Sequence, residues 1–136
     1  MKTNILDIKG MKFETIHPDN AKRTNFPFIS VGNGRLEINA IACNQLKRSK
    51  RFNWAEISIG ERKDEMCLAI RFYEKQTKDS FMVSKKIVKD KQLNSLYISN
   101  KQLLKDVFGS NGIANKMTRY SDVAVDSVND LILIKI

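Results

Sequence analysis

The densest group of chemically suggestive residues lies between positions 47 and 54. It combines cations with aromatic rings: Lys47, Arg48, Lys50, Arg51, Phe52 and Trp54. Cations at this density neutralise phosphates and release their counterions, and an adjacent aromatic ring can stack on an exposed base. The group therefore indicates nucleic-acid binding, with Trp54 as the candidate stacking residue. Two structural interpretations stay open: cations are favoured at a helix C-terminus, and Trp54 opens a predicted strand, where its ring could be core.

A second basic run contains Lys85, Lys86, Lys89 and Lys91. It falls in a stretch that reads as a loop, and charge runs in loops are commonly solvated. A solvated linker is therefore the favoured interpretation. In the alternative interpretation, Lys85 and Lys86 frame one binding face together with the first basic group.

Arg35 follows directly after the turn signal at residues 32–34. An arginine at a turn can reach a phosphate or a base edge, and its planar fork suits guanine. The competing interpretation is a surface cation that pairs with Glu37 or another neighbour and contributes little.

The residues argue against catalysis. His17 is the only histidine, so a Ser–His or Cys–His pair has no other base to draw on. No phosphate-binding glycine motif of the G-x-x-x-x-G-K-[ST] or G-x-G-x-x-G type is present. Cys43 and Cys67 form no C-x-x-C pair and sit among apolar neighbours, as buried free thiols do. We expect a protein that is not an enzyme and that needs no cofactor.

Three carboxylates lie near the end of the sequence. Asp122, Asp126 and Asp130 could hold a divalent cation. Outward residues of an edge hairpin are the favoured interpretation, because charges there discourage edge pairing. We expect no metal site.

Composition narrows the class of protein further. The chain carries 24 Lys and Arg against 15 Asp and Glu, a net charge of +9 that favours polyanionic partners. A hydrophobic content of 42% is enough for a packed core. No apolar run is long enough to span a membrane, and the first residues lack the apolar core of a signal peptide. We expect a cytoplasmic protein with no membrane partner.

Turn signals divide the chain into an N-terminal arm, residues 1–27, and a single domain, residues 28–136. We expect strands at 28–31, 35–38, 54–60 and 66–73, with a short helix capped by Asn39 between the second and the third. The second half is expected to contain strands at 81–83, 96–98, 122–125 and 131–136. A capping box of Ser99 and Gln102 should start its helix, which Gly109 ends, and a polar loop should follow at 110–118.

The two halves resemble each other when they are aligned. Residues 36–39 match 96–99, residues 54–59 match 120–125, and residues 66–70 match 131–135. The sequence therefore predicts a mainly β, α+β fold of two β-α-β-β repeats, about 28–75 and 80–136, that close one small barrel. The alternative is two unrelated hairpins in a meander.

The first half resembles the AbrB family of swapped-hairpin bacterial regulators. Gly34 and Arg35 precede an apolar-x-apolar strand, and Ala42 and Leu46 occupy the inward positions of the short helix. The family usually has proline directly after the first strand, where this sequence has Asn39. Two copies in one chain are similar to the tandem arrangement of the MraZ family, and the whole pattern is also similar to uncharacterised short proteins of bacteria and their phages.

The resemblance implies DNA binding by arginine and lysine on exposed loops, with Arg35 as the residue that carries over by position. We therefore predict a DNA-binding regulator or accessory protein of bacterial or phage origin, with DNA preferred to RNA, as a monomer or homodimer. The alternative is a protein-interaction module, such as a phage accessory, anti-defence or virion protein.

Overall fold

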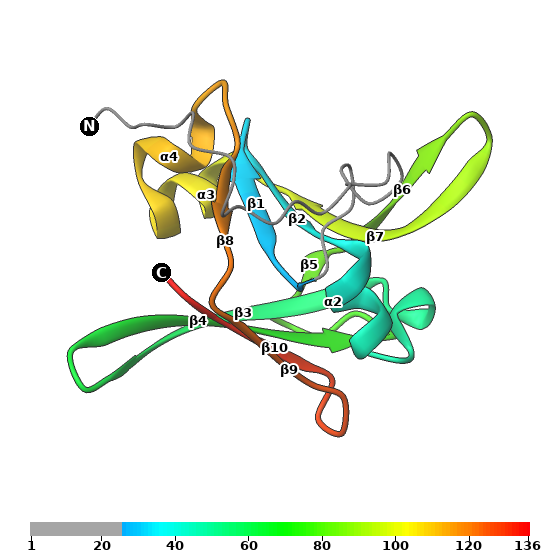
Figure 1. Ribbon diagram of the computed structural model, residues 1–136, viewed down its shortest axis with the longest axis horizontal. Helices are drawn as coiled ribbons and strands as arrows, with labels where there is room; N and C mark the ends of the chain where they lie inside the picture. The colour runs from blue at the N-terminus through cyan, green and yellow to red at the C-terminus, as the bar shows by residue number, and fades with distance from the viewer. Residues whose placement is uncertain (1–25) are drawn as a thin grey trace, which may run out of the picture.

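The computed structural model describes residues 26–136, which form two five-stranded antiparallel sheets packed face to face (Figure 1). Sheet A has the strand order β6-β7-β2-β1-β8 and sheet B the order β5-β3-β4-β10-β9. The predicted mainly β, α+β class is therefore correct. The arm predicted for residues 1–27 lies, except for Phe26 and Pro27, outside the described residues, as does His17.

The strands of sheet A are β1 (Ile29–Gly32), β2 (Arg35–Ile38), β6 (Ser84–Val88), β7 (Lys91–Ser99) and β8 (Thr118–Tyr120). Those of sheet B are β3 (Trp54–Arg62), β4 (Glu65–Tyr73), β5 (Phe81–Met82), β9 (Val123–Asp126) and β10 (Leu131–Lys135). The helices are α2 (Ala40–Gln45), the 3-10 helix η1 (Ser49–Arg51), α3 (Lys101–Phe108) and α4 (Ser110–Ile113). None of these helices is long and apolar enough to cross a membrane.

The core lies between the two sheets because apolar residues alternate along the strands at period two. Both sheets contribute fully or almost fully buried side chains to one cluster, including Ile29, Val31, Leu36, Ile38 and Ile98 from sheet A and Leu68, Ile70, Phe72, Ile132 and Ile134 from sheet B. Phe52, which precedes β3, stacks on Phe72 with ring centroids 5.5 Å apart. Each sheet joins strands from both halves of the chain, since β2 pairs with β7 and β4 pairs with β10.

The stretch that contains Lys85 and Lys86 is strand β6, so the loop predicted there is wrong. β6 pairs with β7 through the two-residue turn at Lys89 and Asp90, whose positive φ values of 52° and 64° are those of a tight hairpin turn. The sequence concealed this strand because β6 is an edge strand with an irregularity between Lys85 and Ile87. Edge strands carry lysine and lose regular alternation, which protects them from pairing with other chains.

The first residues of the two longer helices agree only partly with the caps predicted from the sequence. Asn39 caps α2 as predicted, with its Oδ1 accepting a hydrogen bond from Ala42 N at 3.1 Å. α3 is capped by Asn100, whose Oδ1 accepts from Leu103 N at 2.9 Å, and not by Ser99. Ser99 is the last residue of β7, where it pairs with Arg35.

Gly109 ends α3 with a φ of 63°, as predicted. The predicted polar loop at 110–118 is wrong at both ends, because it opens with α4 and its last residue, Thr118, begins β8. Both elements are too short to show a hydrophobic period in the sequence.

Candidate nucleic-acid interface

Four of the predicted site residues form one exposed group, which we call the η1 cluster: Lys47, Arg48, Lys50 and Arg51. Together with Asn44 and Asn94 they line an open surface depression of about 510 Å³. The chain leaves α2 at Lys47, whose φ of 66° lies in the left-handed region typical of the position after a helix. The change of direction brings η1 back beside β7.

Three buried residues, each three positions after the last, alternate with the cations of the η1 cluster. Leu46, Ser49 and Phe52 are 0%, 4% and 1% exposed, respectively. The cations between these buried residues are exposed to solvent. Ser49 is tied to β7, because its Oγ donates to Asn94 Oδ1 at 3.3 Å. The amide of Asn94 also donates to Asn44 Oδ1.

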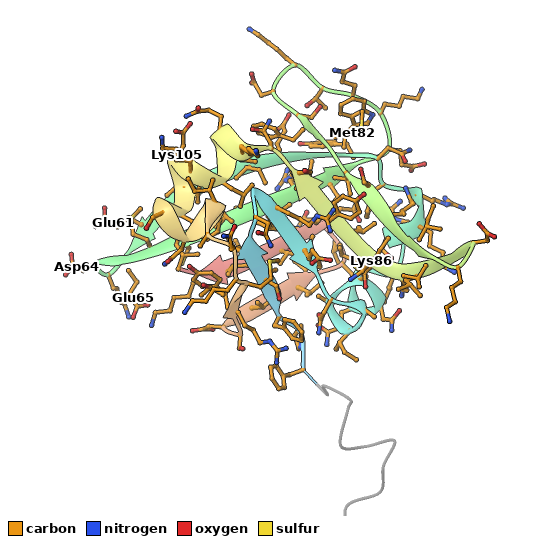
Figure 2. The ribbon with its side chains drawn as sticks, turned by 90° about the horizontal axis from the view of Figure 1, so that it is seen from above. Glu61, Asp64, Glu65, Met82, Lys86 and Lys105 are labelled. Carbon is orange, nitrogen blue, oxygen red and sulfur yellow. The ribbon has the colours of Figure 1, made fainter. Side chains whose placement is uncertain are left out.

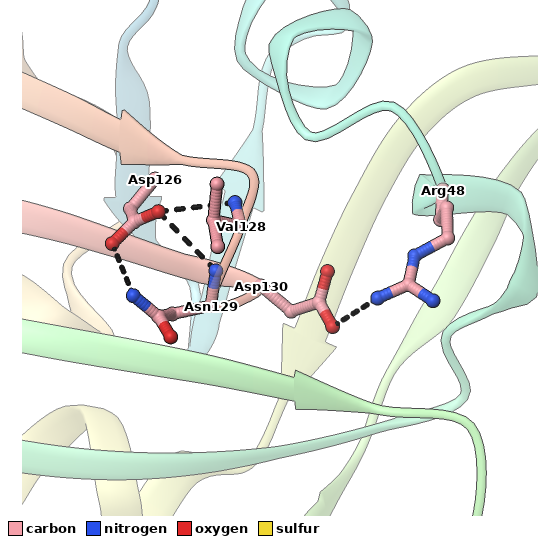
Figure 3. Close-up of polar contacts among 5 residues, drawn as sticks. All are labelled: Arg48, Asp126, Val128, Asn129 and Asp130. Carbon is pink, nitrogen blue, oxygen red and sulfur yellow. Dashed lines mark hydrogen bonds and ion pairs between the residues drawn. The ribbon is translucent and has the colours of Figure 1, made fainter.

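Arg48 differs from the rest of the η1 cluster because a carboxylate faces it. Its Nη2 lies 2.6 Å from Asp130 Oδ2 in the β9–β10 turn (Figure 3), and this hydrogen bond raises the pKa of Arg48. The second carboxylate oxygen of Asp130 is buried and has no hydrogen-bond partner within the described chain. Arg48 thus links η1 to sheet B, with its charge already compensated.

The neighbouring carboxylate of Asp126 shapes the same turn (Figure 3). Its Oδ1 accepts from the backbone N–H groups of Val128 at 3.0 Å and Asn129 at 3.2 Å, and its Oδ2 accepts from Asn129 Nδ2 at 2.8 Å. Bonds to Asn129 are the main cause that lowers the pKa of Asp126. Across residues 26–136, no three His, Cys, Asp or Glu side chains gather where they could hold a metal ion.

Lys85 approaches the η1 cluster from strand β6. Its Nζ donates to Phe52 O at 2.9 Å and to Asn53 Oδ1 at 2.8 Å, and partial burial lowers its pKa. Lys85 therefore fastens the edge of sheet A to the start of β3. Trp54 is half-buried at that start, paired with Tyr73 on one side and Met82 on the other.

Arg35 and Lys86 lie elsewhere, on the outer face of sheet A. The guanidinium carbon of Arg35 stands 4.3 Å from the centroid of the Tyr97 ring. Lys86, labelled in Figure 2, pairs with Glu37 at 3.2 Å. Among the described residues, Glu37 pairs with Lys86 and Arg35 lies over its neighbour Tyr97, so the sequence alternative of a surface cation against Glu37 or another neighbour stays open.

Sequence reasoning assigned no role to a third cation of this face, Arg119 on β8. Its guanidinium carbon lies 3.9 Å above the centroid of the Phe28 ring. The contact depends on the pairing of β8 with β1, which sets Arg119 opposite Ser30. A local sequence motif cannot predict this strand pairing, because it joins segments about ninety residues apart. Six of the eight predicted site residues thus fall on two surfaces, the η1 cluster and the outer face of sheet A. Trp54 and the amino group of Lys85 lie at the start of β3.

Comparison with known protein families, with curated proteins and with solved structures found no match for this chain.

Proposed function

We propose that this protein is a non-catalytic nucleic-acid-binding protein that prefers DNA to RNA, a regulator or accessory protein of bacterial or phage origin. The observation that carries the proposal is the η1 cluster. Within the described residues, Lys47, Lys50 and Arg51 are exposed and have no carboxylate within ion-pairing distance. Uncompensated cations held together at one surface attract polyanions.

The setting of the cluster suits a phosphate backbone. The depression between η1 and β7 offers the exposed side-chain amide of Asn44 beside the cations, and such amides commonly contact phosphate and sugar groups. If Lys47, Lys50 and Arg51 each neutralise one phosphate, the logarithm of affinity for duplex DNA falls with the logarithm of salt concentration at a slope of about −3.

The arrangement of the elements supports a duplicated, AbrB-like origin for the fold. The order strand, strand, helix, strand, strand occurs as β1-β2-α2-β3-β4 and again as β6-β7-α3-β9-β10, with α4 and β8 inserted in the second. The equivalent strands β2 and β7 pair with each other in sheet A, and β4 and β10 do so in sheet B. Such self-pairing is what two copies related by a local two-fold axis produce.

The burial of the last strand of each half changes one part of the alignment between the two halves of the chain. Leu68 and Ile70 face the core from β4, as Ile132 and Ile134 do from β10. Matching residues 66–70 to 131–135 places buried positions against exposed ones, whereas a shift by one residue matches buried with buried. A shift by one residue exchanges the faces of a strand, so the shifted alignment is the one we propose.

The proposal is tested by fluorescence anisotropy with labelled duplex DNA, single-stranded DNA and RNA over a range of salt concentrations. The variant K47E/K50E/R51E should lose at least about tenfold in affinity. A matched control, K75E/K78E/K105E, changes the net charge equally at exposed lysines elsewhere and should retain most of the binding. Absence of wild-type binding to all three ligands at low salt would contradict the proposal, as would equal losses in the two variants.

A protein-interaction module is the second candidate, and exposed apolar side chains at sheet edges favour it. Met82 on β5 and Ile87 on β6 are 63% and 66% exposed. Open edges and apolar surface residues are typical of docking sites for other chains. A heteromeric complex that survives nuclease treatment in a pull-down would support this candidate, and M82D/I87D should then abolish the complex.

A further inference from the structure

Among the described residues, no helix covers the outer face of sheet A, which crosses five strands. Figure 2 looks down on this face, and no described helix is drawn across it. A row of facing residues runs across the whole sheet in register: Ser84, Tyr97, Glu37, Ser30 and Arg119. Their chain neighbours, such as Ile29 and Leu36, are buried in the core. Because successive side chains alternate between faces, this row points away from the core.

The guanidinium carbons of two arginines on this face lie over aromatic rings. Arg35 lies over Tyr97 and Arg119 over Phe28, at 4.3 Å and 3.9 Å from the ring centroids. Within residues 26–136, neither guanidinium pairs with a carboxylate. A stacked guanidinium keeps its N–H edge available for phosphate, and its outer plane can take a nucleobase.

A small hollow lies beside Arg119 and Phe28. It has a volume of about 230 Å³, and its walls include Phe28, Ser30, Glu37, Lys86 and Arg119. The carboxylate of Glu37 and the hydroxyl of Ser30 stand within it as hydrogen-bonding groups. Carboxylates accept from the amino group of cytosine, and serine hydroxyls serve any base edge. The hollow therefore offers polar groups to the edge of a base that stacks on Arg119.

The charges and spacing of the face suit more than one nucleotide. Among the described residues, the carboxylate of Glu37 pairs with Lys86 on this face, and the ion pairs found there do not include Arg35 or Arg119. Arg35 lies opposite Gly32 and Arg119 opposite Ser30, on either side of β1. Standard strand dimensions place their Cα atoms about 12 Å apart. The two arginines can therefore engage different nucleotides of one strand.

We propose that the outer face of sheet A binds single-stranded nucleic acid, with bases stacked on the guanidinium planes of Arg35 and Arg119. The inference rests on the proposed nucleic-acid-binding function and assigns it a second surface, distinct from the η1 cluster. Bases of a duplex are stacked on one another and cannot lie on this face, whereas unpaired bases can. The η1 cluster reads only the backbone, so the sheet face is what distinguishes a single strand from a duplex.

The test compares a labelled oligothymidylate with a duplex of the same length in anisotropy titrations. R35A/R119A should weaken oligothymidylate binding about tenfold or more, as the loss of base stacking does. A control that removes two exposed cations from sheet B and its following loop, R71A/K75A, should weaken it far less. R35K/R119K keeps the charge and removes the planar stack, so it should lose most of the same affinity. Oligothymidylate affinity of R35A/R119A equal to that of the control would overturn the inference.

A second measurement locates the ligand without relying on variants. Amide chemical shifts of the wild-type protein should change at Arg35, Tyr97 and Arg119 when oligothymidylate is added. Changes confined to residues 44–51 would overturn the inference while leaving the proposed function intact. A wild-type protein that binds neither oligonucleotide would instead refute the proposed function itself.

Discussion

The substitution Gly112→Ala tests how the turn before Arg35 is held in place. Gly112 belongs to α4, and a Cβ atom added to it would lie 2.1 Å from Leu104 O and 2.5 Å from Leu104 C. Both atoms are backbone atoms of α3, and the Leu104 side chain is fully buried. The two helices would have to separate to relieve the clash. Overpacking of this kind costs about 1–3 kcal/mol, occasionally more, and a clash with backbone places Gly112→Ala near the upper end.

The same substitution should disturb the outer face of sheet A. Gly112 O accepts a hydrogen bond from Gly34 N at 2.8 Å, and Ala114 O accepts one from Asn33 N at 2.8 Å. On the other side, Asn100 N donates to Gly34 O at 3.0 Å. These bonds clamp the β1–β2 turn from which Arg35 extends. A displaced α4 should therefore loosen the contact of Arg35 with Tyr97.

The assay is equilibrium unfolding in urea, followed by circular dichroism, for three glycine-to-alanine variants. Gly60→Ala is the matched control, because its Cβ would meet nothing within 4 Å, and its effect should stay within about 0.5 kcal/mol. Gly109→Ala also enters open space, but the backbone there has φ 63° and ψ −141°, a region that residues with a Cβ rarely adopt, and the substitution should cost about 1–3 kcal/mol. The expected order of destabilisation is Gly112, Gly109, Gly60. If Gly112→Ala unfolds at the same urea concentration as Gly60→Ala, the close packing of α4 on α3 is refuted.

Three further predictions concern helix capping, a buried thiol and an anchoring lysine. Asn100→Ala should destabilise the fold by about 1 kcal/mol through loss of the N-cap, with Ser99→Ala as a near-neutral control in urea unfolding; the reverse order would restore Ser99 as the cap. Burial raises the pKa of the Cys43 thiol to about 12, so the folded state holds this proton more tightly than the unfolded chain, whose thiol titrates near about 8.5. The contribution of the Cys43 thiol to the free energy of unfolding is therefore complete below about pH 8.5 and declines as the pH rises above it. The variant Cys43→Ala should show a smaller decline in the free energy of unfolding over this pH range. A pH dependence equal to that of the wild type would disprove the raised pKa of Cys43. In the native protein a thiol reagent should label the half-buried Cys67 well before Cys43, and equal labelling rates would contradict the burial. Lys85→Met removes both bonds to the start of β3 and should cost about 1 kcal/mol while leaving the salt slope of DNA binding unchanged; a reduced slope would show that Lys85 contacts phosphate.

Local patterns in the sequence were sufficient for the strands that face the core on one side. Alternation along residues 66–73 and the turn at residues 32–34 predict β4 and the β1–β2 hairpin, because burial of one face imposes period two. The same reasoning fails for β6, since an irregular edge strand with exposed Ile87 and Val88 carries no such period. The N-cap of α3 was misplaced because both Ser99 and Asn100 are good caps, and only the pairing of Ser99 with Arg35 decides between them.

The candidate site also has one part that the sequence could predict and one part that it could not. Lys47, Lys50 and Arg51 are adjacent in the chain, so their shared surface could be predicted from sequence. The compensation of Arg48 by Asp130 and the stacking of Arg119 on Phe28 could not, because each joins segments more than eighty residues apart. Contacts of that separation follow from sheet pairing, which local propensity does not encode.

The central claim is that the η1 cluster binds nucleic acid through phosphate contacts. The most direct measurement is the salt dependence of wild-type binding to labelled duplex DNA, beside the same titration of K47E/K50E/R51E. The account predicts a log–log slope of about −3 for the wild type and a loss of at least about tenfold in affinity in the variant. A wild-type affinity that does not change with salt, or a variant that binds as tightly as the wild type, would contradict it.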